Sequence, residues 1–191
     1  MTLPNIVAAT AAVAWSGVAH AEVVDGSAFA AGFIHPLRGL DHVLVMLTVG
    51  IWSVLAGGRA LWAWPTVFVS TMLVGFVAAT AGVQLPWVGT AISASIVMLG
   101  LLVALAVRAP LWAGAAIIGL FAFFHGHAHG TEVTSVNLLG YGVGFALATA
   151  VLHVAGIAAG MVAEGSSGRL AVRALGALTL VGGLACFGGL A

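Results

Sequence analysis

Imidazole and carboxylate groups gather in two short stretches of an otherwise apolar sequence, HPLRGLDH and HGHAHGTE. A polar group without a partner in an apolar medium costs on the order of 2–7 kcal/mol, so these side chains need a partner or a ligand. Imidazole nitrogens combined with carboxylate oxygens suit borderline divalent ions such as nickel, cobalt, copper and zinc. The two stretches therefore predict a metal site, with these candidate ligands: His35, Asp41, His42, His125, His129 and Glu132.

The spacing within each stretch suggests which side chains can act together. His125 and His129 are four residues apart, so a helix places both on one face, whereas His127 points away from them and is a weaker candidate. His35 and His42 are seven residues apart, or about two turns of a single helix that starts before Pro36. A carboxylate in such a group can either bind the ion or orient an imidazole that does.

A further histidine, His153 in LATAVLHVAGI, lies away from both stretches. It is expected deeper in the membrane than the other candidates. It has two open roles: to relay the ion, or to hydrogen-bond a neighbouring helix. Intramembrane ionisable groups are functional candidates by default.

Composition places the chain in a membrane. Its 191 residues are 62% hydrophobic and 5% charged, with a mean hydropathy of +1.22, whereas soluble domains carry about 25% charged residues. The net charge is zero and lysine is absent, which excludes a nucleic-acid-binding surface. The single cysteine, Cys186, excludes an internal disulfide and a thiolate metal site. We therefore expect an integral membrane protein.

Breaks at clusters of Gly, Pro and Arg divide the chain into apolar segments of roughly the 20 residues that a spanning helix needs. Six spans are predicted: Leu40–Gly57, Ala60–Ala81, Trp87–Val107, Leu111–His129, Leu138–Ala163 and Leu170–Leu190. The expected fold is an all-α polytopic membrane helix bundle, a single domain over residues 22–191. Gly126/Gly130 and Gly140/Gly144 have the spacing that allows close helix approach. Five tryptophans near span ends are expected to be interfacial anchors: Trp52, Trp62, Trp64, Trp87 and Trp112.

Residues 1–21 resemble a secretory signal peptide, with an apolar stretch followed by small residues. An uncleaved seventh helix is the alternative. Cleavage after Ala19 leaves His20 at the mature N-terminus as a further candidate ligand, and cleavage after Ala21 removes it.

The arginines suggest an orientation in the bacterial inner membrane. If the mature N-terminus is periplasmic, the loops after the first, third and fifth spans face the cytoplasm, and the C-terminus is periplasmic. Those loops hold four of the five arginines, Arg59, Arg108, Arg169 and Arg173, which is the positive-inside pattern. Both histidine stretches then lie at the periplasmic side of the membrane.

The chain resembles the HupE/UreJ family over nearly its whole length. The family pattern His-Pro-x-x-Gly-x-Asp-His falls on His35, Pro36, Gly39, Asp41 and His42. The pattern Phe-His-Gly-x-Ala-His-Gly-x-Glu falls on Phe124, His125, Gly126, Ala128, His129, Gly130 and Glu132. The resemblance implies a bacterial nickel permease that supplies hydrogenase or urease maturation, and not an enzyme.

Other functions remain open on the residues alone. One is a metal-binding accessory or sensor protein without transport, and another is a metal or haem redox enzyme of the membrane. No resident cofactor is expected. The predicted partners are the lipid bilayer and a transported divalent ion, with nickel favoured by the resemblance and cobalt, copper or zinc allowed by the ligands. Contact with a metallochaperone or a second copy of the chain is left open.

Overall fold

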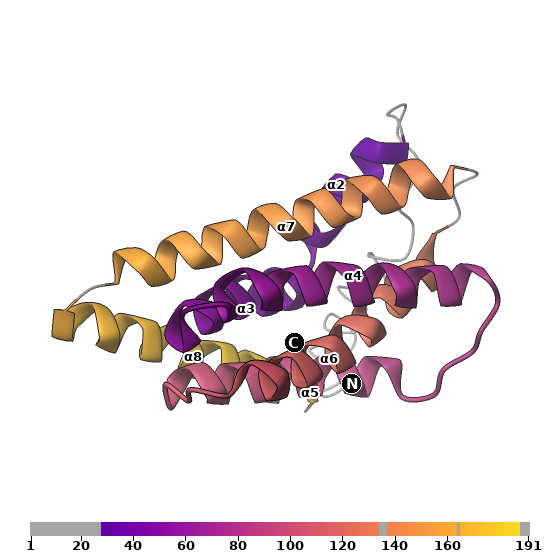
Figure 1. The fold of residues 1–191 in the computed structure, drawn as a ribbon. Coiled ribbons are helices and arrows are strands. Elements are labelled where there is room, and N and C mark those ends of the chain that lie inside the picture. Colours follow the sequence, from indigo (N-terminus) through magenta and orange to yellow (C-terminus); the bar gives the residue numbers. More distant parts are fainter. Residues whose placement is uncertain (1–27, 134–136, 164, 188–191) are drawn as a thin grey trace, which may run out of the picture.

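The computed structural model describes residues 28–133, 137–163 and 165–187, and every regular element in these ranges is a helix (Figure 1). The helices are α2 (Ala28–Arg38), α3 (Leu40–Ala56), α4 (Ala60–Thr80), α5 (Val88–Ala104), α6 (Leu111–Glu132), α7 (Leu138–Val162) and α8 (Gly165–Phe187). The predicted all-α fold is confirmed. The predicted signal peptide over residues 1–21, with His20, lies outside the described residues.

Helices α3 to α8 correspond to the six predicted segments, because the residues that interrupt the apolar runs also end the helices. Gly57 and Gly58 follow α3 with positive φ angles of 72° and 54°, which glycine adopts without steric cost. Pro110 precedes α6 in extended backbone. Helix α6 extends past the predicted end of its segment at His129 to Glu132, so the whole second histidine stretch is helical.

The helices have the lengths and composition of a multi-pass membrane protein. Four of them, α4, α6, α7 and α8, are long and apolar enough to cross a membrane, and α2 with α3 adds a fifth span if this bent pair counts as one. Helix α5 is apolar but has only 17 residues. The count of six spans therefore stays a prediction.

A sharp break separates α2 from α3, and the helix axes there differ by 84°. Gly39 occupies the break with φ −92° and ψ 112°, and glycine is among the poorest helix formers. The expectation that a single helix carries His35 and His42 about two turns apart is therefore wrong. His35 lies in the last turn of α2, and Pro36 lies inside α2 rather than at a helix start.

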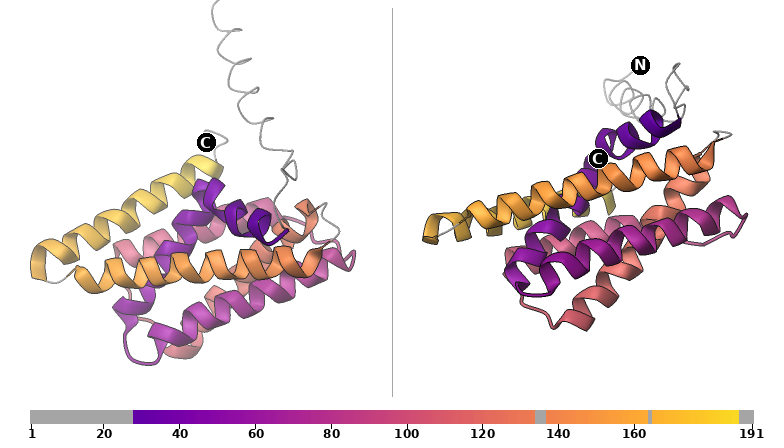
Figure 2. Two further views of the ribbon diagram at one scale, coloured as in Figure 1. Left: turned by 90° about the horizontal axis from the view of Figure 1, so that it is seen from above. Right: turned by 45° about the horizontal axis from the view of Figure 1, so that its top comes forward.

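The helices pack in pairs: α4 lies along α6, α5 along α8, and α7 along both α2 and α3 (Figures 1 and 2). Glycine allows the closest approach. A Cβ atom added to Gly126 of α6 would lie 1.8 Å from the carbonyl oxygen of Met72 in α4, and one added to Gly130 would lie 2.6 Å from that of Phe76. The predicted close approach at this glycine pair is confirmed.

The second glycine pair is confirmed in part. A Cβ at Gly144 would lie 2.1 Å from the carbonyl oxygen of Phe29, so α7 and α2 touch there. Gly140 instead faces the side chain of Asn137, which caps its own helix.

The tryptophans divide into two groups. Trp62, Trp87 and Trp112 are exposed, as expected for interfacial anchors. The same expectation is wrong for Trp52 and Trp64, which are fully buried with ring centroids 4.4 Å apart. Their indole N–H groups donate hydrogen bonds to the backbone carbonyls of two residues in the α5–α6 region, Val107 and Leu111. They hold the α5–α6 connection against the helices that precede it.

Candidate metal site

Three helix ends bring the two histidine stretches together. His35 lies at the end of α2, Asp41 and His42 begin α3, and α6 presents His125, His129 and Glu132 in its last turns. The four imidazoles and two carboxylates that the sequence singled out form one group, called here the histidine cluster. The residues are distant in sequence, and their meeting depends on α6 running back toward the start of α3.

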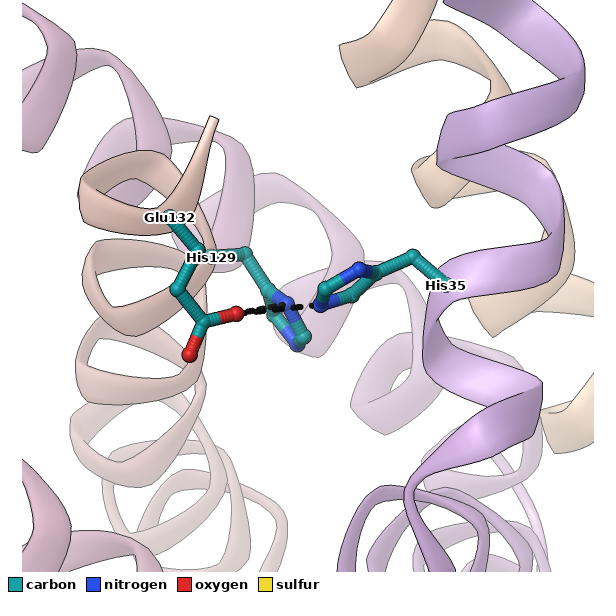
Figure 3. A group of neighbouring side chains, drawn as sticks. All are labelled: His35, His129 and Glu132. Atoms are coloured by element: carbon teal, nitrogen blue, oxygen red, sulfur yellow. Dashed lines mark hydrogen bonds and ion pairs between the residues drawn. The ribbon is translucent and has the colours of Figure 1, made fainter. Parts of the chain in front are cut away.

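The outer part of the cluster joins α2 to α6 (Figure 3). His35 Nε2 lies 3.1 Å from Glu132 Oε2, and His129 Nδ1 lies 3.8 Å from the same oxygen, too far for a hydrogen bond. One potential ligand atom from each of these three residues falls within 4.8 Å of the others. An ion with several ligands requires donor atoms gathered over this kind of distance.

His42 connects the outer part of the cluster to its interior. Its ring centroid lies 4.4 Å from that of His129 and 5.5 Å from that of His125. Its Nδ1 is 2.8 Å from Asp41 Oδ1. Because an ionised carboxylate only accepts hydrogen bonds, Nδ1 is the donor in this pair and Nε2 is left with a free lone pair. Asp41 therefore orients the imidazole, as carboxylates do for histidines that bind metals.

Several ring nitrogens of the cluster are buried without a hydrogen-bond partner among the residues that the structure describes: His42 Nε2, His125 Nε2 and both nitrogens of His129. The other nitrogen of His125, Nδ1, donates to the carbonyl of Phe121 at 2.9 Å. Buried polar atoms normally have partners, and each exception calls for an explanation. A bound cation shared among these rings would satisfy one lone pair of each neutral imidazole.

Exposure falls from the outer members of the cluster to the buried ones, with Asp41 at 33% beside His42. The side chain of Glu132 is 58% exposed, that of His35 24%, that of His42 14% and that of His129 1%. His125 is fully buried. The cluster thus begins at a carboxylate on the surface and ends at an imidazole inside the bundle.

Two of the weaker candidates lie outside the cluster. The Nε2 atom of His127 donates to the carbonyl of Val83 at 2.8 Å, on the side of α6 that faces the α4–α5 connection. His153 lies deeper, on α7, where Nδ1 donates to the carbonyl of Met46 at 2.8 Å. The direction of His127, away from the other two histidines of its stretch, agrees with the helical spacing. For His153, one of the two open roles, a hydrogen bond to a neighbouring helix, is present.

Aromatic rings that sequence reasoning did not select surround the imidazoles. Phe145 lies against His129 with centroids 4.2 Å apart, and Tyr141 lies 5.9 Å from His35. The ring of Phe68 contacts both His125 and His153. Phe68 and Phe145 carry no distinguishing pattern in their apolar helices. Tyr141 is the only tyrosine of the chain, so its residue type could have marked it as a candidate in the sequence.

The fold and the cluster define a multi-pass helical membrane protein with a concentration of buried imidazoles at one end of its bundle. The HupE / UreJ protein family model matches residues 7–186, and the chain belongs to this family. Its members are nickel-related accessory membrane proteins of hydrogenase and urease, and the family is not one of enzymes. The predicted resemblance is confirmed.

A curated relative supports the same assignment. The chain is 42% identical to Protein HupE of Rhizobium leguminosarum bv. viciae over 189 residues, which is 97% of this chain and 98% of the relative. No solved structure matches the chain significantly.

Proposed function

We propose that the protein is a divalent metal-ion permease of the bacterial inner membrane, with nickel as its main substrate, and that it supplies metal for hydrogenase or urease maturation. The observation that carries this proposal is the histidine cluster, whose donor atoms run from an exposed carboxylate to a fully buried imidazole. A binding site for a resident structural ion would be closed. A row of donor atoms that continues from the surface into the bundle suits an ion that passes from one ligand to the next.

The cluster supports a sequence of ligand exchanges. Glu132 and His35 are accessible, so their carboxylate and imidazole meet a hydrated cation first. His129 and His42 then replace water ligands with nitrogen, because their rings are adjacent and buried ring nitrogens of both lack partners within the described structure. Imidazole binds nickel, cobalt, copper and zinc, so preference for nickel rests on family membership.

The distribution of charge supports an orientation. Arg108, Arg169 and Arg173 line one cavity with Leu55, at the end of α3 opposite His42. Under the positive-inside rule the arginine end is cytoplasmic and the histidine cluster is periplasmic. In this arrangement residues 1–21 are a signal peptide, six spans follow, and both mature termini are periplasmic. The 17 residues of α5 rise about 26 Å, close to the roughly 30 Å of a bilayer core.

Membrane potential supplies a driving force for import. Inward movement of a cation gains about 2.3 kcal/mol per charge per 100 mV. The sequence has no Walker A motif, so a nucleotide-driven step would need another protein.

Reconstituted protein in liposomes tests the proposal. With an inside-negative potential, nickel is expected to accumulate in vesicles that contain the protein and not in protein-free vesicles. An excess of cobalt, copper or zinc outside then measures selectivity. Nickel binding without accumulation would instead identify a metal-binding accessory or sensor protein.

A further inference from the structure

We propose that His153 is an inner ligand for the transported ion, and that the ring of Phe68 separates this inner position from the histidine cluster. The proposal rests on the permease function and extends the route beyond the family motifs. The ion would be a borderline divalent cation, because the proposed ligand is an imidazole and a thioether lies one helical turn away.

The geometry of His153 suits a metal ligand. The side chain is 1% exposed, Nδ1 donates to the Met46 carbonyl of α3, and Nε2 is buried with no partner among the described residues. A carbonyl oxygen only accepts, so the proton lies on Nδ1 and the neutral ring directs its lone pair from Nε2. His125 has the same arrangement, with Nδ1 bonded to the carbonyl of Phe121. The two imidazoles therefore have the same tautomer, with the proton on Nδ1 and the lone pair on Nε2.

Phe68 of α4 connects these two histidines. Its ring centroid lies 5.9 Å from that of His125 and 4.9 Å from that of His153, nearly perpendicular to the latter. The row of adjacent side chains thus continues from the cluster through Phe68 to α7. This fully buried ring therefore contacts both imidazoles, and it is the side chain that we place between the two positions.

The next turn of the same two helices adds polar atoms to the inner position. Thr149 lies four residues before His153 on α7, and Met72 lies four residues after Phe68 on α4, so each shares a face with its partner. The hydroxyl of Thr149 is 3.6 Å from the sulfur of Met72. All four side chains are buried, so the α4–α7 contact holds an imidazole, a hydroxyl and a thioether in an apolar surrounding.

The depth of His153 fits an intermediate position. It is the sixteenth residue of α7, and 15 residues of helix rise about 22 Å from Leu138. Among the buried side chains that the structure describes below the cluster, His153 offers an imidazole nitrogen where the other polar groups are hydroxyls. A single lone pair at this depth shortens the distance that the ion must cross unassisted.

The variant His153→Asn tests the inner ligand. Asn keeps an N–H donor for the Met46 carbonyl and removes the Nε2 lone pair. We expect nickel flux into liposomes to fall by about tenfold or more, while equilibrium nickel binding to the detergent-solubilised full chain changes by less than about twofold. The matched control is His127→Asn, which alters another buried histidine bonded to a carbonyl but lies off the row, and its flux should stay near wild type.

The outcomes separate this inference from the permease proposal. Absence of flux in the wild type would remove the permease function itself. Wild-type flux together with undiminished flux in His153→Asn would overturn the inner ligand and leave the permease standing. Loss of both flux and binding in His153→Asn, with an unchanged melting temperature, would also overturn the inner ligand. His153 would then contribute to nickel binding at the histidine cluster itself.

A second variant tests whether the ring of Phe68 separates the inner position from the histidine cluster. Phe68→Leu keeps an apolar side chain and removes the ring that we place between the two positions. We expect the maximal flux to rise by about twofold or more at unchanged nickel binding. Slower flux with unchanged binding would give Phe68 a packing role only and end this part of the proposal.

Discussion

The imidazole rings of His42 and His129 lie 4.4 Å apart, centroid to centroid, although one begins α3 and the other lies near the end of α6. Asp41 fixes the orientation of the first ring, and Phe145 packs against the second. Each ring keeps a buried nitrogen without a partner in the described structure. This contact joins the two family motifs into one group.

Removing either ring of this pair should abolish transport. We expect His42→Ala and His129→Ala each to reduce nickel flux into liposomes to the level of protein-free vesicles, because each deletes a buried nitrogen ligand. His127→Ala is the matched control, since its imidazole faces Val83 and not the cluster. Membrane insertion, judged by yield of detergent-solubilised protein, should be equal in all three. Normal uptake in both cluster variants would remove the pair from the route.

Glu132 should affect the binding of external nickel more than the later movement of nickel through the protein. Its carboxylate is the most exposed member of the cluster, so Glu132→Gln removes a surface charge but keeps an acceptor oxygen near His35. We expect the concentration of nickel at half-maximal flux to rise by about threefold or more, because a divalent cation about 4 Å from a unit charge in water is attracted by about 2 kcal/mol before screening by salt. The maximal flux should change much less. A large fall in maximal flux with unaltered half-saturation would contradict this division.

The close contact of α4 and α6 predicts a steric effect on stability. Gly126→Ala places a Cβ atom 1.8 Å from the Met72 carbonyl oxygen, so the two helices must separate. We expect a clear loss in the melting temperature of the solubilised protein and in transport, since the cluster residues of α6 shift with the helix. Gly89→Ala is the control, because no atom lies within 4 Å of a Cβ added there. Equal melting temperatures for the two variants would show that the α4–α6 contact is not tight.

The buried tryptophans predict a hydrogen-bond effect at the other end of the bundle. Trp64→Phe deletes the donor to the part-buried Leu111 carbonyl, 3.0 Å away, and also shrinks a fully buried ring. The expected cost is about 1–3 kcal/mol in the free energy of unfolding, from the lost hydrogen bond and the lost packing together. Trp112→Phe should cost much less, because Trp112 is 76% exposed. Comparison of the two melting temperatures measures how much more the buried, hydrogen-bonded indole stabilises the fold than the exposed one, and no difference would contradict this prediction.

The proposed topology predicts labelling from opposite sides of the membrane. In a Cys186→Ser background, Gln84→Cys probes the α4–α5 connection and Ser167→Cys probes the start of α8, both at exposed positions. An impermeant maleimide added to intact spheroplasts should label the first and not the second, and disrupted membranes should label both. Labelling of both in intact cells would rule out the proposed orientation.

The sequence by itself determined the membrane class, the all-α fold and, within a few residues, the helices α3 to α8. These follow from local properties, because apolar run length and Gly, Pro and Arg interruptions fix where a helix begins and ends. The two histidine stretches were equally visible, since imidazole and carboxylate stand out in a chain with 5% charged residues.

Tertiary structure decided which faces of these helices meet. The break at Gly39 moved His35 onto α2, the packing of the arginine end buried Trp52 and Trp64, and the α4–α7 contact placed Phe68 beside His153. Gly39 gives the break a local cause, but the burial of the tryptophans and the placement of Phe68 have none. Helix propensity and hydropathy are the same for a residue that faces lipid and one that faces another helix. A lipid-facing residue and a helix-facing residue are distinguished only by how the helices pack. Close approach of backbones at glycine sets this packing and decides which side chains become partners.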